Sequence, residues 1–183
     1  AIDQVKDKVM VSLCSGRVYG SIRKYVEELN LTSFQICDGG GEIFDPVTQK
    51  PVCQKIIPPK IASQIISELK KEKIDFLASC LSRYHLDKSY MTPENVAKKY
   101  EFFVPEWPDL NDVKNPQMTK ITILGVNSNN SKQIEEMLRK YSDDIHYIIL
   151  AYHISQSTGI HALDLTEKSA TKLTALEAYV KLN

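Results

Sequence analysis

Short apolar runs alternate with amphipathic stretches along the chain, a pattern typical of proteins that combine strands and helices. The first such unit is residues 9–17, VMVSLCSGR, which predicts a buried strand followed by a tight turn. An amphipathic helix is predicted next, because Ile22, Val26 and Leu29 recur on one helical face. A strand that leads into a helix in this way begins an α/β unit.

Later segments continue the alternation between strands and helices. Strands are expected at residues 33–37, 42–44, 50–57, 74–80, 120–126, 146–152 and 161–165. Helices are expected at residues 61–69, 92–100 and 130–141. A last helix should follow the final strand, with Leu173, Leu176 and Val180 on its inward face. Pro58 and Pro59 interrupt the pattern and predict a domain boundary between the hairpin and the next helix.

Composition argues against some classes of partner but does not identify one. The chain is 43% hydrophobic and 25% charged, as in ordinary globular proteins, and 23 basic side chains balance 23 acidic ones. This balance gives no reason to expect a nucleic acid or an anionic membrane as a partner. The longest apolar runs are far shorter than the roughly 20 residues of a membrane helix. Since the chain also opens without a signal-peptide pattern, we expect a cytoplasmic protein.

The cysteines allow a prediction of their redox state, and the first residue allows one about processing of the chain. Cys14, Cys37, Cys53 and Cys80 show no CxxC spacing, so reduced core thiols are expected instead of disulfides or zinc ligands. The chain begins with Ala1 instead of Met, which we interpret as a sign of processing or excision.

The turn at residues 14–17 is the first candidate for chemistry. It places the hydroxyl of Ser15 and the backbone N–H groups of the following helix start at the end of a strand. Free donors and the helix dipole favour an anion at such a junction, and phosphate is the natural candidate. The glycines at residues 39–41 do not match GxGxxG, so they predict a turn and not a dinucleotide site.

A second candidate stretch is residues 164–176, DLTEKSATKLTAL, where a strand again leads into a helix. Lys172 then lies in or near the first helical turn, where the dipole disfavours a cation unless an anion lies beside it. A solvated surface lysine is the alternative, and Lys168 has the same ambiguity. The two stretches together suit binding and charge neutralisation of a phosphoryl group, although no nucleophile is visible.

Three stretches in this order, LCSGR, ICDGGGEIFD and LDLTEKSATKLTAL, resemble the haloacid dehalogenase-like (HAD) phosphatases of the Cof type. The resemblance implies that Ser15 and Lys172 have catalytic roles as phosphate ligands and that Gly16 and Arg17 flank the bound phosphate. It implies an α/β fold with a partial, discontinuous Rossmann-like core at residues 1–57 and 167–183. Residues 58–166 would form an inserted α/β cap that selects the substrate.

The family also implies a magnesium-dependent enzyme that hydrolyses small phosphate esters, with sugar phosphates as one option, through a phospho-aspartate. Its DxDGT and GDxxND motifs have no counterpart in these 183 residues. We therefore expect the chain alone to be inactive, with the nucleophile, the general acid and the Mg²⁺ ligands missing from it. Truncation is favoured over evolutionary decay. Gly39 stands where the family usually has Asn.

Weaker candidates lie in other segments. Gly39 and Gly40, and Arg83 and His85 in the polar residues 83–91, are weak candidates for substrate contacts, with a solvated loop as the alternative. Trp107, among the prolines of residues 104–117, could anchor a lid or pack its own loop onto the cap. The four histidines show no metal-ligand spacing, so no metal is assigned in this chain.

Two other functions stay open at this stage. A phosphomutase of the same superfamily would return the phosphoryl group to a sugar. A non-catalytic binding or regulatory protein on a decayed core would explain the missing motifs. The oligomeric state is not predicted.

Overall fold

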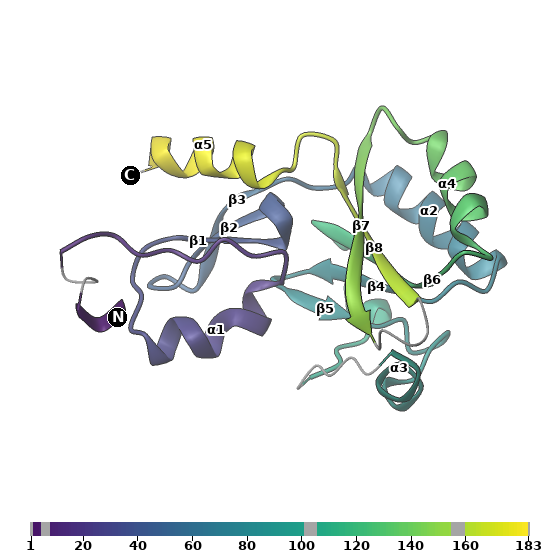
Figure 1. The fold of residues 1–183 in the computed structure, drawn as a ribbon, viewed down its shortest axis with the longest axis horizontal. Coiled ribbons are helices and arrows are strands. Elements are labelled where there is room, and N and C mark those ends of the chain that lie inside the picture. The colour runs from purple at the N-terminus through teal and green to yellow at the C-terminus, as the bar shows by residue number, and fades with distance from the viewer. Residues whose placement is uncertain (1, 5–7, 101–105, 155–159, 183) are drawn as a thin grey trace.

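The computed structural model describes residues 2–4, 8–100, 106–154 and 160–182, and it contains two sheets that lie next to each other (Figure 1). The smaller sheet has the order β1-β2-β3 and the larger one β5-β4-β6-β8-β7, with antiparallel pairing throughout. Short 3-10 helices lie at Ile2–Gln4, Asp38–Gly40 and Leu110–Asp112. None of the described helices is long and apolar enough to cross a membrane.

The three-stranded region, as we call it, contains the smaller sheet, its two helices and residues 8–17. Its elements are β1 (Gln35–Cys37), β2 (Glu42–Asp45), β3 (Lys50–Gln54), α1 (Tyr19–Glu28) and α5 (Lys172–Leu182). Because side chains alternate along a strand, Cys37 faces α1 and Ile36 faces α5. The sheet is therefore the middle layer of three, between one helix on each face (Figure 1).

The five-stranded region contains the larger sheet and three helices. Its elements are β4 (Phe76–Cys80), β5 (Arg83–His85), β6 (Lys120–Val126), β7 (Ile145–Ile154), β8 (Ile160–Glu167), α2 (Pro59–Lys71), α3 (Pro93–Tyr100) and α4 (Ser131–Arg139). Strand β8 lies between β6 and β7, so the predicted β-α-β unit is split by the last strand.

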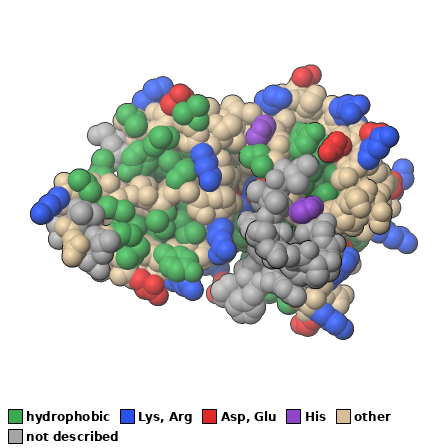
Figure 2. All heavy atoms as spheres, viewed as in Figure 1, with side chains coloured by type: hydrophobic (Ala, Val, Ile, Leu, Met, Phe, Trp, Pro, Cys, Tyr) green, Lys and Arg blue, Asp and Glu red, His purple; other side chains and the backbone are tan. Residues whose placement is uncertain are grey.

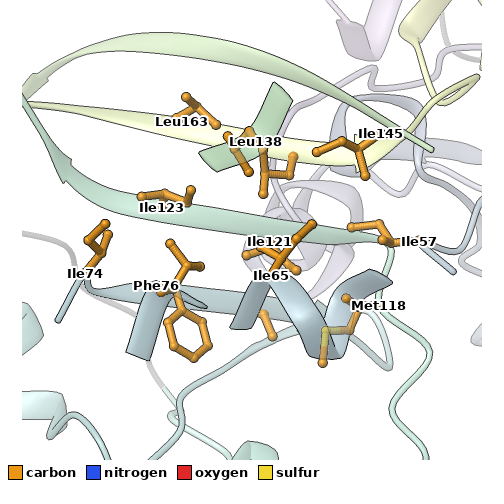
Figure 3. Close-up of a cluster of buried hydrophobic side chains, with 14 of the residues drawn as sticks. Ile57, Ile65, Ile74, Phe76, Met118, Ile121, Ile123, Leu138, Ile145 and Leu163 are labelled. Atoms are coloured by element: carbon orange, nitrogen blue, oxygen red, sulfur yellow. The ribbon is translucent and has the colours of Figure 1, made fainter. Parts of the chain in front are cut away.

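Two apolar clusters fill the faces of the larger sheet. Figure 3 shows the main one, where Phe76, Ile121 and Ile123 of the sheet meet Ile65 of α2 and Leu138 of α4. The second cluster lies on the opposite face and includes Met91, just before α3, and Val96 within α3. Both faces of this sheet are therefore covered, mostly by helices and loops of the same region, and Val18 at the start of α1 adds to the second cluster.

The first predicted strand is confirmed only in part. Residues 13–15 pair in parallel with β1, since Ser15 N donates to Ile36 O at 2.9 Å and Ile36 N donates to Leu13 O at 2.9 Å. The prediction of a buried strand from Val9 onward was wrong, because Val9 is 56% and Met10 66% exposed. No described residue pairs with that part of the segment, so its apolar side chains face solvent.

The inward face predicted for the last helix was also wrong. Leu173, Leu176 and Val180 are 66%, 50% and 68% exposed, whereas Ala175 and Tyr179 are buried against β1 and β2. Helix α5 is apolar on two sides, and the side with Ala175 and Tyr179 is the one that packs against the sheet.

The predicted cysteine state is confirmed in part. All four thiols are free, and Cys37 and Cys80 are buried, but Cys14 is exposed. Trp107 is half-buried and packs its loop onto the second apolar cluster.

Candidate functional site

The predicted phosphate turn and the glycine turn are joined by backbone hydrogen bonds. Gly39 N donates to Ser15 O at 3.0 Å, and Asp38 N donates to Arg17 O at 2.9 Å. The hydroxyl oxygen of Ser15 in turn accepts a hydrogen bond from Arg17 N at 3.1 Å. The fold therefore holds two of the three predicted motifs side by side, although they are more than twenty residues apart in the chain.

The third motif is held against the same glycine turn. Gly40 has a φ of +107°, and a Cβ there would lie 2.2 Å from Thr171 O and 2.9 Å from Lys172 N. Only glycine fits this close approach. Gly39 also has a positive φ, of 69°, but a Cβ there would meet nothing within 4 Å. The asparagine usual in the family could occupy this position, because it tolerates left-handed backbone.

Lys172 is the first residue of α5, and its side chain is exposed. The helix start is fixed by Thr171 and Thr174, because Thr174 N donates to Thr171 Oγ1 at 3.1 Å and Thr171 N donates to Thr174 Oγ1 at 3.1 Å. The lysine therefore lies at the positive end of the helix dipole, beside the glycine turn, where a bound anion would offset the repulsion.

Sequence reasoning missed a buried charged cluster behind this turn. Lys120, at the start of β6, lies 3.2 Å from Asp38 Oδ1 and 3.6 Å from Asp164 Oδ2. The hydroxyl of Thr119 donates to Asp38 Oδ2 at 2.6 Å, and that of Thr122 donates to Asp164 Oδ1 at 2.6 Å. Asp38 belongs to the three-stranded region and the other four residues to the five-stranded region, so the cluster spans both.

Burial and charge shift the pKa values of this cluster in opposite directions. Burial disfavours the charged form of Lys120, but Tyr84, Asp38 and Asp164 outweigh it and raise the pKa of the lysine well above its ordinary value. Burial raises the pKa of Asp164 and raises that of Tyr84 to about 12. The lysine is therefore a permanent cation at neutral pH.

Glu42 makes a second polar contact between the regions. Its Oε2 accepts hydrogen bonds from Gln54 at 2.7 Å and from the hydroxyl of Ser82 at 2.9 Å. Its Oε1 is buried without a partner among the described residues. Burial, together with nearby Asp38, raises the pKa of Glu42 to about 7. Ser82 belongs to the tight turn between β4 and β5, so this turn is held against β2.

The two weaker candidates for substrate contact in β5, Arg83 and His85, differ in their exposure to solvent. Arg83 is exposed, forms an ion pair with Glu106 and lines a groove of about 180 Å³ together with Arg23 and Ser21 of α1. His85 is buried, and its Nδ1 lies 3.3 Å from both Cys80 Sγ and Arg83 O. Burial also lowers the pKa of His85. The structure therefore leaves no exposed imidazole there for a substrate.

No group of three His, Cys, Asp or Glu side chains that could hold a metal ion occurs within the described part of the chain. The carboxylates of Asp38 and Asp164 in the buried cluster already lie beside the ammonium group of Lys120, which would repel a cation. The described residues do not fit a magnesium site.

A family model described as haloacid dehalogenase-like hydrolase matches residues 1–183. The chain belongs to the haloacid dehalogenase-like hydrolases. This membership confirms the family resemblance and the α/β fold class. No protein with a curated description matches the sequence.

Solved structures of other family members share the fold. One is a haloacid dehalogenase-like hydrolase from Bacteroides thetaiotaomicron, with a TM-score of 0.74 and 17% identity over 99% of this chain and 67% of that one. Another, from B. subtilis, has a TM-score of 0.75 and 15% identity over 98% of this chain and 69% of that one. A sugar phosphatase of HAD subclass IIB has a TM-score of 0.68 and 12% identity over 99% of this chain and 65% of that one. This chain therefore spans about two thirds of their length.

Proposed function

We propose that this hydrolase chain forms the phosphate-binding wall and the cap of a magnesium-dependent phosphatase that acts on small phosphate esters. The observation that carries the proposal is the meeting of Ser15, the glycine turn and Lys172, which are contributed by three distant segments. Family membership supports it, and a structural neighbour described as a sugar phosphatase makes sugar phosphates one candidate class of substrate.

Each of these groups suits a role in binding a phosphoryl group. The hydroxyl of Ser15 accepts from Arg17 N, which leaves its hydrogen free to donate to a phosphate oxygen. Lys172 would neutralise negative charge on the phosphoryl group as that charge redistributes in the transition state. Gly16 and Arg17 would flank the phosphate. We propose residues 58–166 as the cap, because they contain the elements of the five-stranded region apart from Glu167 at the end of β8.

The nucleophile and the magnesium ligands require other residues. The 183 residues contain neither DxDGT nor GDxxND, and the described residues do not fit a metal site. We propose that these groups belong to segments of the parent protein outside this sequence and that the chain alone is inactive. Magnesium, when bound there, would stabilise charge on the phosphoryl oxygens.

The codons that flank the gene segment provide the first test. An upstream DxDGT and a downstream GDxxND support the phosphatase, whereas the absence of both would favour a binding or regulatory protein. The encoded protein should then hydrolyse p-nitrophenyl phosphate only with Mg²⁺.

Lys172 is tested in that same protein. Lys172→Ala should lower kcat/KM by at least about a hundredfold, the typical effect of removing one charge-stabilising group. Lys168→Ala is the matched control, because Lys168 Nζ donates to Ser142 O within the five-stranded region. Equal activity of the two variants would remove Lys172 from the site.

A further inference from the structure

The ammonium group of Lys120 contacts both regions of the molecule. Lys120 is 1% exposed. Its Nζ donates a hydrogen bond to Gly16 O at 2.6 Å and another to the hydroxyl of Tyr84 at 3.1 Å. Gly16 belongs to the phosphate turn of the three-stranded region, and Tyr84 lies on β5 of the five-stranded region. One side chain therefore connects the cap elements directly to the turn that contains Ser15.

The surroundings of Lys120 hold its ammonium group in one place. Two of its three hydrogens have acceptors, and the side facing Asp38 and Asp164 has two carboxylates at 3.2 and 3.6 Å. Asp38 Oδ1 accepts no hydrogen bond from the described residues, so its attraction to the lysine is one of charge. A buried cation without such neighbours would be strongly disfavoured. Movement of Nζ away from this position is therefore costly.

The contact with Gly16 reaches Ser15 through a single peptide unit. A trans peptide is planar, and its C=O and N–H point in opposite directions. Gly16 O faces Lys120 Nζ, while the N–H of the same peptide, that of Arg17, donates to Ser15 Oγ at 3.1 Å. The orientation of this peptide therefore determines whether the hydroxyl oxygen of Ser15 has its donor.

We propose that Lys120 is a positioning residue for phosphate binding: it fixes the Gly16–Arg17 peptide and thereby orients the hydroxyl of Ser15 towards the ligand. This inference rests on the proposed function for the role of Ser15. It adds a residue from the cap side that does not touch the phosphate. Correct placement of the five-stranded region would then be a condition for a formed phosphate turn.

The unaltered chain provides a test that does not depend on the folding of any variant. A scalar coupling across the hydrogen bond between Lys120 Nζ and the Gly16 carbonyl carbon is measurable by NMR in a protein of 20.8 kDa. Detection of the coupling supports the contact. A Lys120 ammonium that exchanges with water as fast as an exposed lysine, with no coupling, would overturn the proposal.

Variants test whether the contact acts on Ser15. Lys120→Met alone leaves the carboxylates of Asp38 and Asp164 without their cation, so the main variant adds Asp38→Asn at the fully buried one, which retains the hydrogen bond acceptor for Thr119. Hydrogen exchange at Arg17 N should become about tenfold faster, as expected for one lost hydrogen bond. Lys70→Met is the control, because Lys70 pairs with Asp87 inside the five-stranded region.

Titration with inorganic phosphate separates this inference from the proposed function. If the unaltered chain binds phosphate at Ser15, the double variant should bind it about tenfold more weakly, while Lys70→Met binds it as before. Unchanged affinity and unchanged exchange at Arg17 N in the double variant would refute the role of Lys120. If the unaltered chain binds no phosphate at Ser15, the proposed phosphate site fails, and the positioning of Ser15 by Lys120 for phosphate fails with it. A normal coupling to Gly16 would then show that the contact itself is correct.

Discussion

The two regions differ in how fully they cover their apolar surfaces. In the five-stranded region, helices or loops cover most of both faces of the sheet, and Phe76, Ile121 and Ile123 are completely buried, although Tyr147 and Ile148 on the edge strand β7 are exposed. In the three-stranded region, α5 covers one face of the sheet but presents a second apolar stripe to solvent, and Val9 and Met10 are exposed as well. Figure 2 shows hydrophobic side chains gathered on the half of the molecule that contains α5 and the smaller sheet.

This difference separates the part that provides stability from the part that binds. Burial of apolar surface is the main favourable term in folding, so most of it should come from the five-stranded region. The phosphate turn lies in the region with less buried surface, and Lys120 and Glu42 link it to the more stable one.

Truncation of the larger core should have the largest effect. Phe76→Ala removes a fully buried ring and should lower the free energy of unfolding by about 3–5 kcal/mol. Leu173→Ala, on the exposed stripe of α5, should change it by less than about 0.5 kcal/mol. Urea unfolding followed by circular dichroism measures both. Similar losses in the two variants would contradict the larger share of stability assigned to the five-stranded region.

The glycine turn should be sensitive at one position and tolerant at the next. Gly40→Ala forces a Cβ to within 2.2 Å of Thr171 O and strains the backbone, so we expect a loss of about 2–4 kcal/mol and displacement of α5. Gly39→Asn, where no atom lies within 4 Å of the new Cβ, should stay within about 1 kcal/mol of the original protein. Thermal unfolding compares them, and equal melting temperatures would refute the close approach to α5.

The contact through Glu42 predicts a stability that depends on pH. Burial, with Asp38 nearby, raises the pKa of Glu42 from its ordinary 4.5 to about 7, so the folded state binds this proton more tightly than the unfolded chain. Protonation of Glu42 therefore adds to the free energy of unfolding below about pH 4.5. This stabilisation, of up to about 3 kcal/mol, is lost as the pH rises to about 7. Glu42→Gln should flatten this part of the profile of unfolding free energy against pH. A slope that persists in the variant would assign the effect to another group.

Asp87 should act in the opposite direction and in the five-stranded region. Burial would raise its pKa, but hydrogen bonds from Lys70, Ser89 and Asn111 lower it from 3.8 to about 2. Ionised Asp87 therefore stabilises the folded chain above about pH 3.8, and this stabilisation is lost as the pH falls to about 2. Asp87→Asn should remove this loss of unfolding free energy at acid pH without changing the pH dependence assigned to Glu42. Profiles of unfolding free energy against pH for the two variants measure this.

The smallest effect is expected on the outer stripe of α5. Leu176→Lys and Val180→Lys should change the free energy of unfolding by less than about 0.5 kcal/mol each, since both side chains are already exposed. They should also reduce any self-association, because large exposed apolar patches favour contacts. Sedimentation velocity measures this association. A large loss of stability would show that the stripe is buried.

Periodicity predicted much of the five-stranded region because its helices have a single apolar face. Strand β6 was predicted with its observed bounds, and α4 lies within the helix predicted at residues 130–141. The same reasoning gave the wrong face for α5, since a helix with apolar residues on two sides has no unique inward stripe. Only the close contact of Ala175 and Tyr179 with the sheet decides between them.

The candidate site was predictable only where a local motif exists. The segments of Ser15 and Lys172 could be found from the strand-to-helix pattern and the family resemblance. Lys120 could not, because its hydrogen bond partners are 104 and 36 residues away in the chain, at Gly16 and Tyr84. A lysine at the start of a strand is normally predicted to be exposed. Its burial depends on how the two sheets meet, which no local pattern contains.

We propose that Ser15, the glycine turn and Lys172 form one phosphate site in the three-stranded region. Titration of the chain with inorganic phosphate, followed by backbone amide NMR, tests it most directly. We expect the amides of Ser15, Gly16, Gly40 and Lys172 to shift together along one binding curve, and Ser15→Ala to weaken the affinity for phosphate that this curve measures. Shifts confined to the groove lined by Arg83, or no saturable shift at all, would contradict it.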